Sequence, residues 1–242
     1  MNALSETSLG RMAGVLVAPV RTYQSIAARP TFWVPLLFTV LLGMAGAFLV
    51  THRIDMGEVL RQQMQARLDK QGTKMSAQDL DRMVEMTRRF TPYIAMGTAV
   101  LTPGIYLLVA CLYWGIFKFL GNDLEYPVSA SVFAYGMMPW AVASVLGSLV
   151  LLPGGAAISG GEFLRRGGIL ASNLAALLPE GSGKPLQTLA ASLDFFTLWT
   201  LLLLVIGYRT AIRGTTARAA TVVVGVWAVY VAVKVGWATL FG

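Results

Sequence analysis

The sequence predicts an all-α integral membrane protein with five transmembrane helices and an extramembrane helical hairpin between the first and the second. The 242-residue chain is 56% hydrophobic and only 13% charged, which is too apolar for an ordinary soluble domain. It contains uncharged runs that are each long enough to cross a bilayer, among them Pro30–Thr51, Phe90–Phe117 and Tyr126–Gly161. These runs lack the two-residue alternation that is typical of a transmembrane barrel.

Residues 1–30 are predicted to form an amphipathic N-terminal tail of short helices. Apolar residues recur at helical spacing before Pro19 and again before Pro30, with arginines between them. These apolar positions are Leu9, Met12, Ala13, Leu16 and Val17, followed by Val20, Tyr23, Ile26 and Ala27. Such helices can lie on the membrane surface or pack against the protein's own helices, and the sequence leaves both interpretations open.

A five-helix membrane domain is predicted over residues 31–242. Its first span covers about 31–51, where Trp33 is placed to anchor the helix at the membrane interface. The spans that follow are expected at about 93–119, 128–152, 186–208 and 217–241. The Gly-rich connection over residues 153–187 is expected to hold a short interfacial or re-entrant piece, and the sequence does not decide between the two.

The segment 52–90 holds six of the twelve acidic residues and predicts a polar helical hairpin outside the membrane. Ser76 and Asp79 resemble a capping box at the start of its second helix, with Asp in place of the usual Glu. Methionines recur along both predicted helices of the hairpin. They form either an adaptable binding surface or the packed face between the two helices.

Prolines mark two candidate helix-kink or packing sites within the spans. Pro103 is expected to interrupt the second span, and Pro139 lies inside the third. Tyr135 precedes Pro139 by one helical turn, so both residues are expected to face the same side. This arrangement predicts either a kink that packs against neighbouring helices or a ligand site.

Basic residues set the predicted orientation. The short turn between the fourth and fifth spans carries three arginines, Arg209, Arg213 and Arg218. Positive charges in short loops are typical of the cytoplasmic side of a membrane. The N-terminus is therefore expected in the cytoplasm, and the hairpin and the C-terminus outside, although basic residues in the hairpin count against this orientation.

Asp194 and Lys234 are the charges that lie deepest within apolar stretches. Measured along their helices from the arginine-rich turn, they lie at about 22 Å and about 24 Å, so they are predicted to be nearly level. An ionisable group inside a membrane is a candidate functional group. Three interpretations stay open: a direct or water-bridged pair, snorkelling of Lys234 to the outer headgroups, or an ion path.

The sequence carries no signature of an enzyme, a cofactor site or a metal site. The single histidine, His52, and the single cysteine, Cys111, lie far apart in the chain. Lys184 follows a Gly-rich stretch, but it lacks the following Ser or Thr and the strand–loop–helix context of a phosphate loop. The net charge of +7 arises from scattered arginines, which flank membrane spans and do not indicate nucleic-acid binding.

Three blocks, taken in their order along the chain, resemble one known family. They are Pro19, Tyr23 and Ile26 with Pro30, Trp33 and Pro35; Asp123-Leu-Glu-Tyr-Pro-Val128 with Phe133-Ala-Tyr135, Met138 and Pro139; and Leu193–Trp199 with Gly207 and Thr216–Ala219. This pattern resembles the Yip family (Ypt/Rab-interacting proteins, the Yip-one domain) in its bacterial branch. The resemblance covers nearly the whole chain, and the polar hairpin is also similar to that of many bacterial members.

The resemblance implies five transmembrane helices, a cytoplasmic N-terminus and no known enzymatic activity. The chain is therefore interpreted as a multi-pass protein of the bacterial inner membrane, a scaffold or adaptor that binds membrane-protein partners or shapes the lipid bilayer. Self-association is left open. The alternative is a small transporter, channel or lipid-moving protein that uses Asp194 and Lys234 in a polar path.

Overall fold

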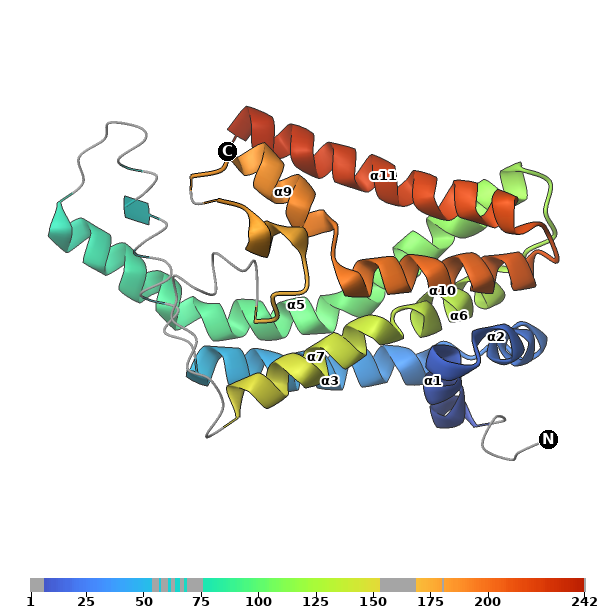
Figure 1. The fold of residues 1–242 in the computed structure, drawn as a ribbon. Helices are drawn as coiled ribbons and strands as arrows, with labels where there is room; N and C mark the ends of the chain where they lie inside the picture. Colours follow the sequence, from blue (N-terminus) through green and yellow to red (C-terminus); the bar gives the residue numbers. More distant parts are fainter. Residues whose placement is uncertain are drawn as a thin grey trace.

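The structure is a computed structural model that describes residues 7–53, 57, 61, 64–65, 68, 76–152, 169–179 and 181–241. Its elements are α1 (Ser8–Val17), α2 (Pro19–Ala28), α3 (Trp33–Arg53), α5 (Ala77–Phe119), α6 (Tyr126–Gly136), α7 (Met138–Leu151), the 3-10 helix η2 (Leu174–Leu177), α9 (Lys184–Ser192), α10 (Phe195–Ala211) and α11 (Thr216–Phe241) (Figure 1). The described residues form helices and connecting turns, as the apolar runs predict.

Four helices in the described part of the chain are long and apolar enough to cross a membrane. They are Trp33–Arg53, Gln78–Phe119, Tyr126–Leu151, which joins α6 and α7, and Thr216–Leu240. α10 is also apolar but has only 17 residues. The all-α membrane class is therefore confirmed. The first half of the predicted hairpin and residues 153–168 of the Gly-rich connection lie largely outside the described residues.

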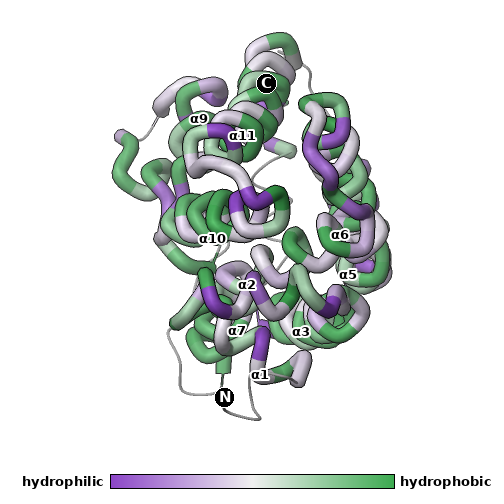
Figure 2. The backbone as a smooth tube through the Cα atoms, turned by 90° about the vertical axis from the view of Figure 1, so that its right-hand side faces the viewer, coloured by the Kyte–Doolittle hydropathy of each residue, from purple (hydrophilic) through white to green (hydrophobic). Residues whose placement is uncertain are grey.

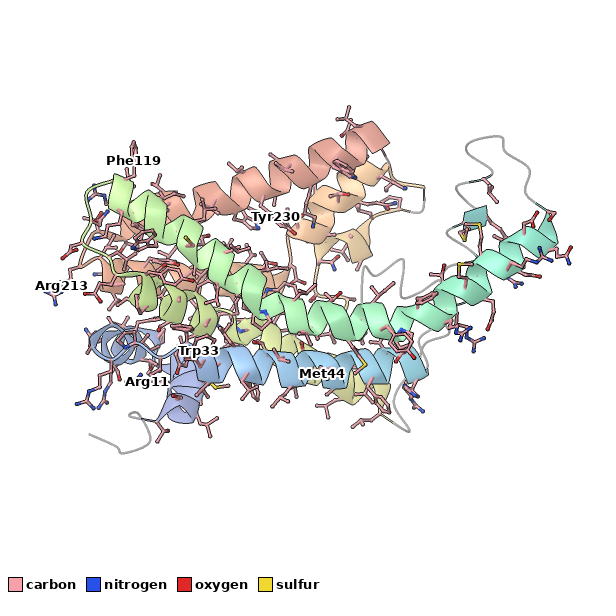
Figure 3. All side chains as sticks on the ribbon, turned by 180° about the vertical axis from the view of Figure 1, so that it is seen from behind. Arg11, Trp33, Met44, Phe119, Arg213 and Tyr230 are labelled. Atoms are coloured by element: carbon pink, nitrogen blue, oxygen red, sulfur yellow. The ribbon has the colours of Figure 1, made fainter. Side chains whose placement is uncertain are left out.

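The helices share one end at which several turns meet. The guanidinium of Arg218 at the start of α11 donates hydrogen bonds to the carbonyl of Leu120 at 2.8 Å and to Asn122 Oδ1 at 3.3 Å. These bonds hold the α10–α11 turn beside the α5–α6 turn. Arg11, Phe119 and Arg213 lie at this end of the molecule (Figure 3). Viewed from this end, hydrophilic segments gather in the turns and in α1 and α2 (Figure 2).

The core lies near this end, where α5, α6 and α10 meet around the Tyr208 ring. The Tyr113 and Phe117 rings of α5 lie 4.9 Å and 5.1 Å from the Tyr208 ring, measured between centroids. The Ser129 hydroxyl lies 3.1 Å from the Tyr208 hydroxyl and donates to the carbonyl of Ala110 at 2.7 Å. Buried hydroxyls are stabilised by such bonds, so this polar contact fits inside an apolar core.

The N-terminal tail forms two helices, as predicted, and both pack into the bundle. α2 contacts α6 and α10, and α1 contacts α2, α3, α6 and α7. Val15, Tyr23 and Ile26 are fully buried. Leu9, Val17 and Val20 are instead 68%, 83% and 48% exposed, so only part of the apolar residues packs against the bundle, and membrane-surface binding by the tail stays a prediction.

The second helix of the predicted hairpin is continuous with the second span. The Ser76 hydroxyl accepts a hydrogen bond from the backbone N–H of Asp79 at 3.1 Å, so this residue caps α5 as the sequence indicates. α5 is one continuous helix of 43 residues through Pro92 and Pro103, so Pro103 does not break it, and the kink expected at Pro103 stays a prediction. A proline removes one backbone donor, which a membrane helix tolerates when its other bonds persist. The helix changes direction along its length (Figure 3).

Candidate functional site

The fourth span is broken at Asp194, and this break is the centre of the candidate site. α9 ends and α10 begins on either side of Leu193 and Asp194, so the unbroken helix expected over 186–208 is wrong. Oδ1 of Asp194 accepts hydrogen bonds from the backbone N–H groups of Phe196 at 2.8 Å and Thr197 at 3.2 Å. Asp194 is therefore the N-cap of α10, a position where Asp is preferred because it satisfies backbone donors that lack helical partners.

A short segment that precedes α9 completes the hydrogen bonding at the break. The backbone N–H of Phe195 donates to the carbonyl of Ser172 at 3.0 Å, and that of Leu174 donates to the carbonyl of Leu193 at 3.2 Å. The Ser172 hydroxyl also donates to Oδ2 of Asp194. Irregular backbone at membrane depth is tolerated only where its polar groups are satisfied, and these bonds meet that requirement.

A cavity of about 380 Å³ lies beside this break. Part of its wall comes from small residues of α3 and α7: Gly43, Gly46, Ala47, Ala143 and Gly147. Facing groups come from residues 169–173 and from the start of α10. The volume falls within the range of pockets that hold small molecules, which is roughly 300–1,000 Å³.

The cavity lining also includes polar residues. Ser144 and Ser148 of α7 line the cavity together with Ser172, Asn173 and Asp194. Asp194 is the one charged residue among the described lining residues, and it is only 4% exposed. Its carboxylate lies at the N-terminus of α10, where the helix dipole stabilises a negative charge. The cavity therefore combines apolar walls with one fixed negative charge.

Lys234 lies apart from this cavity. Its Nζ is 5.3 Å from the centre of the Tyr230 ring on the same helix, and it does not belong to the described lining. Tyr230 of α11 and Met44 of α3 lie on opposite sides of the bundle (Figure 3). Among the described residues, no ion pair within 4.0 Å joins Lys234 to Asp194. The water-bridged form of the predicted pair stays a prediction.

The third span also breaks, at Met137, between Tyr135 and Pro139. α6 ends at Gly136, and the Met137 N–H donates to the carbonyls of Phe133 and Tyr135, so the Tyr135 carbonyl is satisfied as expected. Tyr135 is fully buried, and its hydroxyl lies 3.3 Å from Thr31 Oγ1. The proline site is therefore packed in the core, while a ligand role for Tyr135 and Pro139 stays a prediction.

A second cluster, which the sequence did not predict as a unit, surrounds the Tyr23 ring of α2. A Cβ added at Gly207 of α10 would lie 2.6 Å from Val132 Cγ1 and 2.8 Å from Tyr23 Cε1. A Cβ at Gly136 of α6 would lie 3.4 Å from the Tyr23 hydroxyl. The two glycines therefore make the space that the ring fills. Burial raises the pKa of the Tyr23 phenol, so this side chain stays protonated at neutral pH.

Arg11 of α1 completes this cluster. It is only 4% exposed, and its guanidinium donates to the carbonyls of Arg29 at 2.8 Å and Ser25 at 3.3 Å at the end of α2. It also donates to Thr31 Oγ1 at 3.2 Å, the hydroxyl beside Tyr135. A cation stabilises the carbonyl end of a helix. In the sequence, the signal for this role of Arg11 was its position between Leu9 and Met12 on an otherwise apolar stretch.

One known family model matches most of the chain, including the segments that form the break and the Tyr23 cluster. The Yip1 domain model matches residues 13–238. The chain belongs to the Yip1 family. One relative is Membrane protein YknW of Bacillus subtilis (strain 168), which is 27% identical over 209 residues, or 85% of this chain and 80% of that protein. No solved structure matches the chain significantly. The resemblance inferred from the sequence is confirmed, and the protein is a multi-pass membrane protein of this family.

The Yip1 sequence blocks coincide with both helix breaks. The block that ends in Met138-Pro139 covers the break in the third span, and the block Leu193–Trp199 covers the break at Asp194. The described residues include no group of three or more His, Cys, Asp or Glu side chains that could hold a metal ion. This arrangement is suited to binding a small molecule, because one cavity offers a carboxylate, hydroxyls and apolar walls.

Proposed function

We propose that this Yip1-family protein is a non-enzymatic scaffold or adaptor of the bacterial inner membrane that binds other membrane proteins. The observation that carries the proposal is an apolar face on the first part of α5, residues 77–90, here called the α5 arm. Met83, Met86 and Phe90 are 42%, 64% and 53% exposed. Their spacing places them on one side of the helix. Methionine-rich faces adapt to the shape of a binding partner.

The same helix also has a packed side. Leu80 and Val84 are only 8% and 7% exposed. Leu80 and Val84 therefore form the packed side of this arm, whereas Met83 and Met86 are exposed, which supports the binding interpretation of these methionines. Arg61 binds Asp81 on this arm at 2.6 Å, an exposed ion pair that contributes little to stability.

The proposed topology has five spans, with the N-terminus in the cytoplasm and the hairpin that contains the α5 arm outside. α5 is about 65 Å long, which is more than twice the roughly 30 Å of a hydrocarbon core, so one part of it must project from the membrane. The turn at Arg209–Arg218 lies at the end that also carries α1 and α2, which supports a cytoplasmic assignment for that end. α9 and α10 together supply the fourth of these spans, in addition to the four long apolar helices.

A transport role for the Asp194–Lys234 pair has less support. A polar path would need to include both charges, and the described lining of the cavity includes Asp194 without Lys234. Lys234 lies against Tyr230 of its own helix. Partner binding through the α5 arm requires no such path, so the scaffold role is the function that fits the described residues best.

Photo-crosslinking in living cells tests the proposal. A benzoylphenylalanine placed at Met86 is expected to form a discrete adduct with another membrane protein. The same residue at Glu85 is the matched control, because Glu85 is also exposed but points about 100° away around the helix. Substitution of Met83 by Glu in the same chain should weaken the Met86 adduct. Equal adducts at both positions, or none at Met86, would contradict partner binding by this face.

A further inference from the structure

We propose that the cavity beside the Asp194 break is a binding site for an organic ammonium group. This inference goes beyond the scaffold role, because the described lining of the cavity contains no residue of α5 and so shares nothing with the α5 arm. The site unites a buried carboxylate, two aromatic rings and a volume that suits a small organic group. Each of these features contributes separately to recognition of a cation.

The first feature is a negative charge with neutral partners. Asp194 accepts hydrogen bonds from the N–H groups of Phe196 and Thr197 and from the Ser172 hydroxyl, all of which are uncharged. The described lining supplies no lysine, arginine or histidine. Hydrogen bonds from neutral donors orient the carboxylate, and no cation of the described residues forms an ion pair with it within 4.0 Å. A cation that enters the cavity therefore meets an opposite charge in surroundings of low dielectric constant, where attraction is stronger than in water.

The second feature is a pair of aromatic rings in the same wall. The centroids of Trp140 and Phe196 are 6.3 Å apart, with their planes inclined by 40°. Both rings line the cavity, and Phe196 is adjacent in the chain to the N-terminal residue of α10. Faces of aromatic rings attract ammonium groups, and tryptophan does so most strongly. A carboxylate with two nearby rings is a combination that favours an ammonium group over a neutral polar ligand.

The third feature is space. The cavity volume of about 380 Å³ is far larger than a metal ion needs and falls in the range of organic ligands. Gly46 of α3 faces open space, since a Cβ added there would meet no atom within 4 Å. The ligand is therefore an organic cation, which can come from a lipid headgroup or from a free amine in solution. Both sources present the same ammonium chemistry to Asp194.

Charge-selective thiol labelling tests the site in the full-length protein in lipid nanodiscs. Ser148, which lines the cavity, is changed to Cys in a chain that also carries Cys111→Ser. The ratio of the labelling rate with the trimethylammonium-ethyl methanethiosulfonate reagent to that with the negatively charged sulfonatoethyl reagent is expected to be about tenfold higher than at a cysteine on the exposed surface. Asp194→Asn should lower this ratio to the surface value. The change keeps the cap of α10, because Asn serves as an N-cap about as well as Asp.

Two controls separate the site from general effects. Gln187→Cys on the exposed side of α9 reports the charge preference of the membrane surface in the same half of the protein. Gly46→Leu fills the cavity while leaving Asp194 in place. It should lower the rate at which the cationic reagent labels the Ser148→Cys variant. Gly97→Leu is its matched control, since that glycine also has no atom within 4 Å of an added Cβ and does not line the cavity.

The source of the ammonium group follows from protection against labelling. Nanodiscs of phosphatidylglycerol alone carry no amine, and phosphatidylethanolamine or soluble ethanolamine is then added to them. Slower labelling with phosphatidylethanolamine alone identifies a lipid headgroup, and slower labelling with ethanolamine identifies a free amine. Three results would overturn the proposal: a charge preference in Asp194→Asn that stays above the value at Gln187→Cys, a preference equal to that at Gln187→Cys when Asp194 is present, or labelling that neither amine slows.

Discussion

Gly207 in the Tyr23 cluster and Gly46 in the cavity wall have opposite surroundings. Around Tyr23, a Cβ at Gly207 would lie 2.6 Å from Val132 and 2.8 Å from the Tyr23 ring, so the glycine is required by close packing. In the cavity region, a Cβ at Gly46 would meet no atom within 4 Å. The same residue type therefore brings helices together in the Tyr23 cluster and leaves space beside Asp194.

This difference separates the framework of the protein from its binding site. The Tyr23 cluster joins α2, α6 and α10, and Arg11 adds bonds from α1 to the end of α2. The cavity region instead holds a helix break whose backbone groups are satisfied by a neighbouring segment. Substitutions that alter packing should therefore reduce stability strongly in the first region and weakly in the second.

Removal of the Tyr23 ring should have the largest effect. Tyr23→Ala deletes a fully buried aromatic side chain between α6 and α10, and loss of such a ring costs roughly 3–5 kcal/mol. The free energy of unfolding, measured by titration with sodium dodecyl sulfate in mixed micelles, should fall by that amount. The tail would then also lose its attachment, so proteolysis within residues 7–30 should become faster.

Tyr23→Phe is the matched control for this prediction. The Tyr23 hydroxyl is buried and has no hydrogen-bond partner among the described residues, so its removal leaves no unpaired group there. A buried hydroxyl without a partner costs about 1–3 kcal/mol, which the Phe variant avoids. The variant should be as stable as the parent or more stable. A large loss in Tyr23→Phe would show that the hydroxyl, and not the ring, holds the cluster together.

Gly207→Ala should have the next largest effect. The added methyl group would overlap Val132 and the rigid Tyr23 ring, and overpacking of this kind costs roughly 1–3 kcal/mol. Gly136→Ala should cost less, because its nearest contact is Leu204 Cδ2, the end of a flexible side chain. Gly225→Ala on α11 serves as the control without neighbours. Equal unfolding free energies for all three variants would contradict the close packing around Tyr23.

Much of the fold could be predicted from the sequence because bilayer thickness sets the length of apolar runs. The spans at α3, at the second part of α5 and at α11 follow from this rule, and the cap at Ser76 follows from local hydrogen bonding. The helices of the tail were visible as apolar residues at helical spacing. Each of these features depends on residues close together in the chain.

The breaks and the cavity were harder to predict because they depend on contacts between distant segments. The sequence places Asp194 on a continuous helix, because the break at Asp194 is held by hydrogen bonds to residues 172–174, and the sequence does not reveal that this segment lies there. Gly46 and Gly207 look alike in the sequence, and only packing distinguishes them. The closing family block did, however, lie over the break at Asp194.

Loss of the Asp194 cap should have a moderate effect. Asp194→Ala removes the acceptor for the N–H groups of Phe196 and Thr197 and should cost about 1 kcal/mol. Asp194→Asn keeps a capping oxygen and should retain most of the stability. Unfolding titrations of both variants, alone and with Lys234→Met, provide the measurement. If Asp194 and Lys234 form a pair, Asp194→Asn should instead lower the free energy of unfolding less when Lys234 is also replaced.

Gly46→Ala should have the smallest effect, and it opposes the result at Gly207 most sharply. Both variants add the same methyl group to a membrane helix, but the group at Gly46 meets no atom within 4 Å. Replacement of a helical glycine by alanine at an unstrained position stabilises by about 0.4–1 kcal/mol, so the variant should match or exceed the parent in unfolding free energy. Gly43→Ala on the same helix is the control, since its Cβ would lie 3.2 Å from Ala99 Cβ. A loss at Gly46 as large as that at Gly207 would mean that the cavity region is as tightly packed as the Tyr23 cluster.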